Sequence, residues 1–177
     1  MFESKAIKKS MPDFAEVVEL YESSFPANER TYLWWLRLMA CKKSVNFKAY
    51  YDEGSLVGLS FVSSYGNVDF LLYLAVSEKT RSKGYGGMIL RKIREESGGR
   101  DIYLNIEPLD ETSENYEQRK KRLDFYLRNG FKVSDYSIYY KDDVFTVLTT
   151  GEEFSPEGYA KAIRNTALDP FRIERNS

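Results

Sequence analysis

The 177-residue chain contains no histidine, which excludes Ser-His-Asp and Cys-His catalysis, HExxH metallopeptidases and haem held by an axial histidine. Its one cysteine, Cys41, rules out an intrachain disulfide, a CxxC redox pair and a four-cysteine zinc site. We expect Cys41 to be a buried apolar residue and not a nucleophile, because no base is available to activate its thiol. No apolar run approaches the roughly 18 residues of a membrane span, and the longest covers residues 70–76.

The chain also lacks an excess of either charge. Its 26 basic and 27 acidic residues leave a net charge of −1, so the composition predicts neither a nucleic-acid partner nor a membrane partner. Residues 1–5 lack the basic-then-apolar layout of a secretory signal, and we expect the protein to be cytoplasmic. Aromatic residues are abundant instead, with 14 tyrosines that supply both packing area and titratable hydroxyls.

Hydrophobic periodicity divides the chain into elements in the order βααβββαβαββ, followed by one further helix. This order predicts an α/β fold in one domain, with a mixed sheet that carries helices on its faces. The strand at 68–76 is apolar on both faces, so we expect it at the centre of the sheet. The other strands are predicted near residues 2–8, 47–51, 57–61, 102–107, 131–140 and 144–148, and the helices from Asp13, at 31–41, 84–97 and 114–128, and from Ser155.

Capping and apolar patterns describe the individual helices. Asp13 opens the first helix, with Glu16 three residues later as its capping-box partner. The helix at 31–41 is apolar almost all round, so we expect it to be covered on more than one side. Ser155 and the proline after it open the last helix, and the tail from Asp169 is expected to be frayed.

Residues 76–90 carry the clearest chemical signal, because a strand ends there, a basic and glycine-rich turn follows, and an apolar helix begins. The first N–H groups of a helix have no intrahelical acceptor, and the helix dipole adds positive charge, so a phosphate fits at this point. Gly84 and Gly86 allow the backbone to approach an anion closely, and Arg81 and Lys83 add charge. The alternative is a glycine-rich connection with solvated basic side chains.

Two common nucleotide-binding motifs do not fit this segment. A P-loop requires Gly-Lys-Ser/Thr, whereas Gly86 is followed by Gly87 and Met88. A dinucleotide fingerprint needs glycine or alanine where the chain has Ile89. The pattern Arg-x-x-Gly-x-Gly at 81–86, the later Phe-Tyr-Leu-Arg-Asn-Gly-Phe at 125–131 and the element order instead resemble the GNAT superfamily of acyl-CoA-dependent N-acetyltransferases.

The resemblance covers roughly residues 6–150. It implies a GNAT N-acetyltransferase domain at 1–150, with residues 151–177 as a C-terminal helix and tail packed on it or extending from it, and acetyl-CoA as co-substrate without a metal. In such enzymes the loop amides hold the pyrophosphate of coenzyme A, and the preceding strand pairs with the pantetheine arm. The implied coenzyme-binding residues are Leu74, Ala75, Val76, Arg81, Ser82, Lys83, Gly84, Tyr85 and Gly86.

Tyr126 is the candidate general acid. Acyl transfer from a thioester to an amine requires deprotonation of the amine, stabilisation of the carbonyl oxygen and protonation of the leaving thiolate. Tyr126 stands where GNAT enzymes usually carry the tyrosine that protonates this thiolate. The alternative is that Tyr126 only packs in an aromatic cluster with Phe125 and Phe131.

Glu107, at the carboxyl end of the strand at 102–107, is the candidate general base or amine anchor, since strand ends of this kind form ligand crevices. A water relay as the base, or a solvated strand end, is the alternative. Many GNAT members have asparagine seven residues before the tyrosine, where it contacts pantetheine. The chain has Arg119 there and Arg122 three residues later, so the asparagine contact is not carried over.

The acceptor pocket is expected in the two N-terminal helices and the loop between them, with Glu29, Tyr32 and Trp35 as substrate-binding residues. Glu29 would attract a cationic amine, although aromatic residues such as Tyr32 and Trp35 belong to a core more often than to a pocket. The amine acceptor, a small molecule or a peptide, stays open, and the helix from Ser155 can cover a sheet edge or form a homodimer contact. Alternative functions are a non-catalytic acyl-CoA-binding or regulatory module on the same fold and an unrelated phosphate-binding α/β protein.

Overall fold

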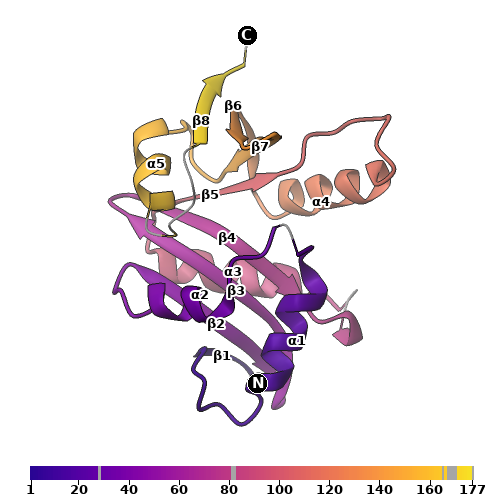
Figure 1. Ribbon diagram of the computed structural model, residues 1–177, viewed down its shortest axis with the longest axis vertical. Helices are drawn as coiled ribbons and strands as arrows, with labels where there is room; N and C mark the ends of the chain where they lie inside the picture. Colours follow the sequence, from indigo (N-terminus) through magenta and orange to yellow (C-terminus); the bar gives the residue numbers. More distant parts are fainter. Residues whose placement is uncertain (28, 81–82, 165, 167–170, 177) are drawn as a thin grey trace.

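The computed structural model describes residues 1–27, 29–80, 83–164, 166 and 171–176. Its centre is one 8-stranded mixed sheet with the strand order β1-β2-β3-β4-β5-β7-β6-β8 (Figure 1). The strands are β1 (Phe2–Ala6), β2 (Val45–Asp52), β3 (Ser55–Tyr65), β4 (Val68–Val76), β5 (Asp101–Ile106), β6 (Lys132–Tyr140), β7 (Asp143–Thr149) and β8 (Phe171–Arg175). The helices are α1 (Phe14–Ser24), α2 (Leu33–Met39), α3 (Tyr85–Ser97), α4 (Tyr116–Arg128) and α5 (Pro156–Arg164), with a short 3₁₀ turn η1 (Glu78–Thr80).

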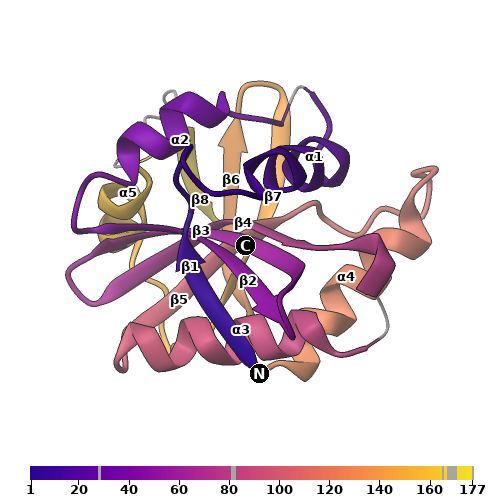
Figure 2. The same cartoon turned by 90° about the horizontal axis from the view of Figure 1, so that it is seen from below.

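The helices cover both faces of the sheet, as the mixed pattern predicts. Figure 2 shows α3 and α4 on one face, with α1, α2 and α5 on the other. On the α3 face, Ile89 and Ile93 pack against Ile102 and Leu104 of β5, the alternating apolar positions of that strand. No helix in the described part of the chain is long and apolar enough to cross a membrane.

Strands β1 to β4 form an antiparallel meander, and β4 lies between β3 and β5, so its predicted central position is confirmed. The turn between β2 and β3 is also confirmed. Glu53 and Gly54 both have positive φ there, 49° and 79°, which suits a tight hairpin turn.

Strand β4 bends away from β5 halfway along its length. Its register with β3 passes from Leu71 to Tyr73 without a partner for Leu72, which marks a β-bulge at Leu72. The parallel pairing with β5 ends at Phe70, just before the bulge. At the paired end, the buried carboxylate of Asp69 accepts hydrogen bonds from Arg100 (2.8 and 3.2 Å), which ties the two strands together there.

The C-terminal segment adds more to the sheet than the predicted helix. Residues Phe171–Arg175 form β8, which pairs antiparallel with β6, so the expectation of a frayed tail is wrong for this stretch. Asp169 itself lies outside the described residues. Helix α5 packs on the sheet, and the Ser63 hydroxyl of β3 donates a 2.8 Å hydrogen bond to the carbonyl of Ala162.

Three local expectations near the N-terminus are wrong. Asp13 is the N-cap of α1, as predicted, but the predicted capping box with Glu16 does not form, because the Asp13 carboxylate makes no capping bond and accepts a 2.6 Å bond from the Tyr51 hydroxyl of β2. Helix α2 was expected to be covered on more than one side, but it leaves Trp34 60% exposed and Leu38 49% exposed. Cys41, two residues after the end of α2 at Met39, is exposed and not buried.

Candidate active site

The divergence of β4 from β5 opens the sheet and creates a cavity of about 830 Å³. Both strands line it, through Leu71–Leu74 and Leu104–Ile106, and α4 contributes Tyr126 and Arg122. The edge of β4 beyond Phe70 pairs with no other strand of the described chain, so a backbone edge is available to an extended ligand. Leu74, Ala75 and Val76, the predicted pantetheine-binding residues, lie on this unpaired stretch.

Helix α3 begins where β4 and η1 end. Gly84 is its N-cap with φ of 81°, a left-handed conformation that glycine adopts without strain. The first helical hydrogen bond is donated by Met88 to Gly84, so the amides of Tyr85, Gly86 and Gly87 have no partner inside the helix. Lys83 is exposed beside these amides, and free amides next to a cation are the arrangement that suits an anion. The predicted coenzyme residues Arg81 and Ser82 lie outside the described residues.

Gly86 and Tyr85 have structural roles that the sequence did not reveal. A Cβ at Gly86 would lie 2.9 Å from Cζ of Phe125, so the absence of a side chain lets α3 pack against α4. The Tyr85 hydroxyl donates a 2.9 Å hydrogen bond to Asp52 in the β2–β3 hairpin. That bond directs the Tyr85 side chain toward the hairpin and leaves only its backbone amide for a coenzyme phosphate.

Tyr126, the predicted acid, lines the cavity from α4. Its ring packs edge-on against Phe125 (5.1 Å between centroids) and Phe131 (5.4 Å), so the predicted aromatic cluster is present. Burial raises the pKa of the Tyr126 hydroxyl to about 12, and the charge of Arg122 opposes this rise. The phenol is therefore protonated at neutral pH and can act as a donor at the opening.

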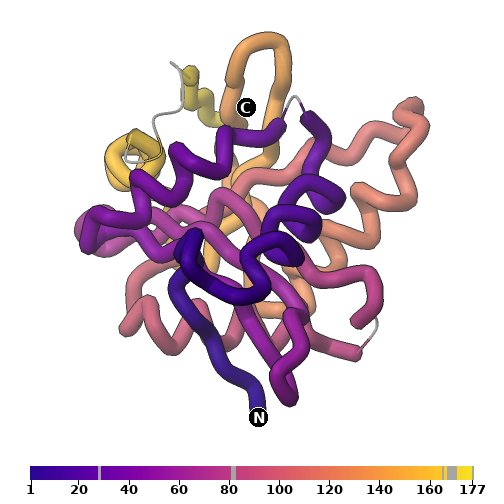
Figure 3. Tube along the Cα trace, turned by 60° about the horizontal axis from the view of Figure 1, so that its bottom comes forward, coloured from indigo at the N-terminus to yellow at the C-terminus, as the bar shows by residue number. Residues whose placement is uncertain are grey.

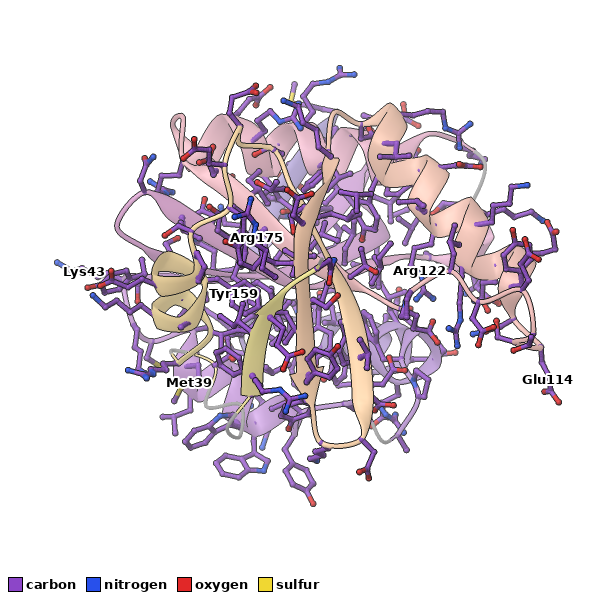
Figure 4. All side chains as sticks on the ribbon, turned by 90° about the horizontal axis from the view of Figure 1, so that it is seen from above. Met39, Lys43, Glu114, Arg122, Tyr159 and Arg175 are labelled. Carbon is purple, nitrogen blue, oxygen red and sulfur yellow. The ribbon has the colours of Figure 1, made fainter. Side chains whose placement is uncertain are left out.

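Glu107 lies directly after β5 and also lines the cavity, but arginines of α4 occupy both of its oxygens. Arg119 contacts Oε1 at 3.0 Å and Arg122 contacts Oε2 at 2.9 Å, while Asn115 donates a weaker 3.3 Å bond. Figure 4 shows Arg122 between α4 and the β6–β7 hairpin. The basic residues 119 and 122 thus fasten α4 to the end of β5, and they would have to move before Glu107 could take a proton or hold an amine.

The predicted acceptor residues separate in the structure. Glu29 lines the cavity, whereas Tyr32 and Trp35 do not. Tyr32 is 77% exposed and stacks on Trp34. Trp35 points from α2 into the hydrophobic cluster that α1 and α2 form with the sheet. The aromatic wall lies instead at the other end of the cavity, where Tyr159 of α5 and residues of the β6–β8 region close it (Figure 4).

Tyr73 of β4 is a cavity residue that the sequence pattern concealed, because it reads as one more apolar position of a buried strand. Its hydroxyl donates to the carbonyl of Glu29 (2.9 Å) and accepts from the amide of Thr31 (3.0 Å). Only its hydroxyl distinguishes Tyr73 from the neighbouring apolar residues of β4. The hydrogen-bond partners of that hydroxyl lie more than 40 residues away in the chain, so the local pattern does not reveal them.

No group of three or more acidic or cysteine side chains that could hold a metal ion occurs among the described residues. The arrangement consists of a diverging pair of parallel strands, an anion-binding helix terminus at one end and a protonated phenol beside the opening. These features define an α/β protein whose sheet opens at a cavity beside a helix N-terminus, an arrangement that can accommodate an extended ligand with an anionic end.

Comparison with known proteins identifies the class more closely. The family model described as the acetyltransferase (GNAT) domain matches residues 43–133, which is more than half of the chain, and the chain therefore belongs to the GNAT acetyltransferase family. The Bacillus subtilis (strain 168) protein YjbC, an inferred acetyltransferase, is 37% identical over 81 residues. That match covers 46% of this chain and 39% of YjbC, so the chain spans well under half of that relative's length.

Solved structures show the same fold. A GNAT-family protein from Bacteroides thetaiotaomicron superposes with a TM-score of 0.71 at 23% identity, covering 92% of this chain and 93% of the other. An aminoglycoside 6'-N-acetyltransferase complexed with coenzyme A gives 0.65 at 17% identity, with 83% and 95% covered. Arabidopsis thaliana Naa50 with a bisubstrate analogue gives 0.63 at 16% identity, with 85% and 98% covered. The predicted GNAT fold is thus confirmed, with β8 as an addition to the predicted order.

Proposed function

We propose that the protein transfers the acetyl group of acetyl-CoA to a primary amine by direct attack of the amine nitrogen. The observation that carries this proposal is the continuity of one cavity with the unpaired edge of β4 and the hydroxyl of Tyr126. GNAT structures of the same fold that were solved with coenzyme A support acetyl-CoA as the co-substrate.

The residues around the opening suit the coenzyme. The backbone of Leu74, Ala75 and Val76 would pair with the pantetheine arm, and the first amides of α3 with Lys83 would hold the pyrophosphate. Bound acetyl-CoA supplies the activated acetyl thioester. The thioester region would then lie where β4 and β5 diverge, in the cavity that Tyr126 also lines.

Tyr126 serves as the general acid in this proposal. A thiolate that leaves without a proton carries a full negative charge on sulfur, so a positioned proton donor accelerates the reaction. The raised pKa of Tyr126 keeps its proton in place until the sulfur becomes basic. Glu107, held by its two arginines, fixes α4 and with it the position of Tyr126 relative to β5.

The test is turnover of acetyl-CoA over a panel of amines: a polyamine, an aminoglycoside, an amino acid and a peptide with a free N-terminus. Release of the coenzyme thiol is followed with a thiol reagent, against an enzyme-only control because Cys41 is exposed and reacts too. We expect amine-dependent thiol release and an acetylated product by mass spectrometry. Coenzyme A binding without thiol release would identify a binding module, and tighter binding of ATP than of coenzyme A would rule out the coenzyme assignment.

A further inference from the structure

Glu29 occupies the loop between α1 and α2, on the opposite side of the cavity from α4. Figures 2 and 3 show this loop beside the β6–β7 turn. Glu29 and residues on both sides of it line the cavity. The Glu29 side chain is exposed at the mouth and forms no ion pair within the described chain. It differs in this respect from Glu107, whose two oxygens already bind guanidinium groups.

The backbone on both sides of Glu29 is fixed to the sheet. The Tyr73 hydroxyl donates to the Glu29 carbonyl at 2.9 Å and accepts from the Thr31 amide at 3.0 Å. Tyr21 of α1 donates to the Thr31 carbonyl at 2.8 Å, and its ring meets the Tyr73 ring edge-on at 5.3 Å. The loop that carries Glu29 is therefore held in place by the strand that forms one wall of the opening.

Charged groups of several elements act on the Glu29 carboxyl across the cavity. Partial desolvation at the cavity wall raises its pKa, the negative charge of Glu107 after β5 raises it further, Arg122 of α4 lowers it, and Asp143 of β7 raises it. Arg30, the adjacent cation in the loop, turns away to donate to the carbonyl of Glu22. A carboxylate with a raised pKa accepts a proton more readily at neutral pH than an ordinary glutamate does.

We propose that Glu29 is the catalytic proton acceptor for the amine, and that Tyr73 is a positioning residue that holds Glu29 at the cavity mouth. This inference rests on the proposed acetyl transfer. The ammonium of the acceptor gives one proton to Glu29, which passes it to bulk water at the mouth. The freed nitrogen lone pair forms the C–N bond, and the C–S bond breaks with its electron pair on sulfur. The second nitrogen proton reaches that sulfur by way of Tyr126, so each acetyl transfer releases one proton to solvent.

The test compares butylamine, which is protonated at neutral pH, with hydroxylamine, which is uncharged there and needs no proton acceptor before attack. We expect Glu29→Gln to lower kcat at neutral pH by about 10²-fold or more for butylamine, with much less loss for hydroxylamine. The acidic limb of the kcat pH profile with butylamine should move to alkaline pH, because without Glu29 the ammonium must lose its proton to solvent, and Glu29→Asp should restore part of the rate. Glu19→Gln, the same change on an exposed position of α1, should match the wild type.

The outcomes separate the inference from the proposed function. A wild-type protein that acetylates no amine overturns both. An active wild type whose Glu29→Gln variant keeps the acidic limb at the wild-type pH overturns the inference alone. A variant that raises KM for butylamine without lowering kcat also overturns it, because that result identifies an amine anchor.

Tyr73→Phe tests the positioning role, since it keeps the ring contacts and removes only the hydroxyl that holds the loop. We expect kcat to fall several-fold for butylamine and to stay near wild type for hydroxylamine. In the Glu29→Gln background the same change should have little further effect, because the two residues act through one proton transfer. Equal losses for both amines, or full additivity of the two substitutions, would reduce Tyr73 to a general structural role.

Discussion

Replacing Tyr126 by phenylalanine distinguishes an acid from a packing residue. The substitution keeps the ring contacts with Phe125 and Phe131 and removes only the hydroxyl. That hydroxyl makes no hydrogen bond within the described part of the chain, so its loss leaves no protein partner unsatisfied. The free energy of unfolding should therefore change by less than about 0.5 kcal/mol.

The effect on catalysis should be far larger than the effect on stability. With a pKa of about 12, the Tyr126 phenol is protonated throughout the working range and loses its donor proton only as the pH rises toward that value. Loss of one proton-transfer group slows a reaction by about 10²–10⁴-fold. This corresponds to about 3–5 kcal/mol of transition-state stabilisation. The loss should appear in kcat more than in KM, because the thiolate exists only as the C–S bond breaks.

The assay is steady-state thiol release with the best amine of the panel, combined with urea denaturation and calorimetry of coenzyme A binding. We expect native stability, near-native coenzyme affinity and the fall in kcat. A Tyr126→Phe protein that retains wild-type kcat would refute the acid role, and a protein that loses stability in parallel with kcat would show that the ring packing had also been disturbed.

Further predictions concern the fold, the coenzyme loop and alkaline stability. Gly58→Ala should lower the free energy of unfolding, measured in urea, by about 1–3 kcal/mol. The new Cβ would lie 2.5 Å from the Ile89 side chain and 2.6 Å from the Ala75 carbonyl. An unchanged urea midpoint would contradict the close approach of β3 and α3. Lys83→Ala should weaken coenzyme A binding about fivefold by calorimetry, and an equal loss for pantetheine, which has no pyrophosphate, would argue against the phosphate contact. Burial raises the pKa of Tyr50 to about 12. The stability that the neutral phenol provides is therefore complete below the unfolded pKa of about 10 and is lost as the pH rises toward 12. A urea midpoint that stays constant between these two pH values would exclude this linkage.

The sequence predicted the strands that obey simple periodicity. Strand β4 was placed at the centre because it is apolar on both faces, and it is central. Strand β8 was missed because Arg172, Glu174 and Arg175 give Phe171–Arg175 a polar character, which suits an edge strand whose charges face solvent. The pattern does not predict the exposure of Trp34. Apolar residues show that a helix face can be buried, but whether another segment packs on that face depends on the rest of the chain.

The site was predictable only in part, for a related reason. The motifs indicated Tyr126 and Glu107, and both line the cavity. The cavity itself depends on the bulge at Leu72, which local apolar patterning does not encode. The arginine partners of Glu107 and the loop contacts of Tyr73 join residues far apart in the sequence, so no single segment contains that information.

The unpaired edge of β4 links ligand binding to the stability of the whole chain. From Leu71 to Val76 this edge lacks the neighbouring strand that satisfies backbone groups elsewhere in the sheet. A pantetheine arm that pairs there would complete the sheet in the folded protein and would have no comparable partner in the unfolded chain. Coenzyme A at about 100 times its Kd would then add about 2.7 kcal/mol to the free energy of unfolding. The concentration of coenzyme around the protein would thus set its resistance to unfolding as well as the occupancy of its site.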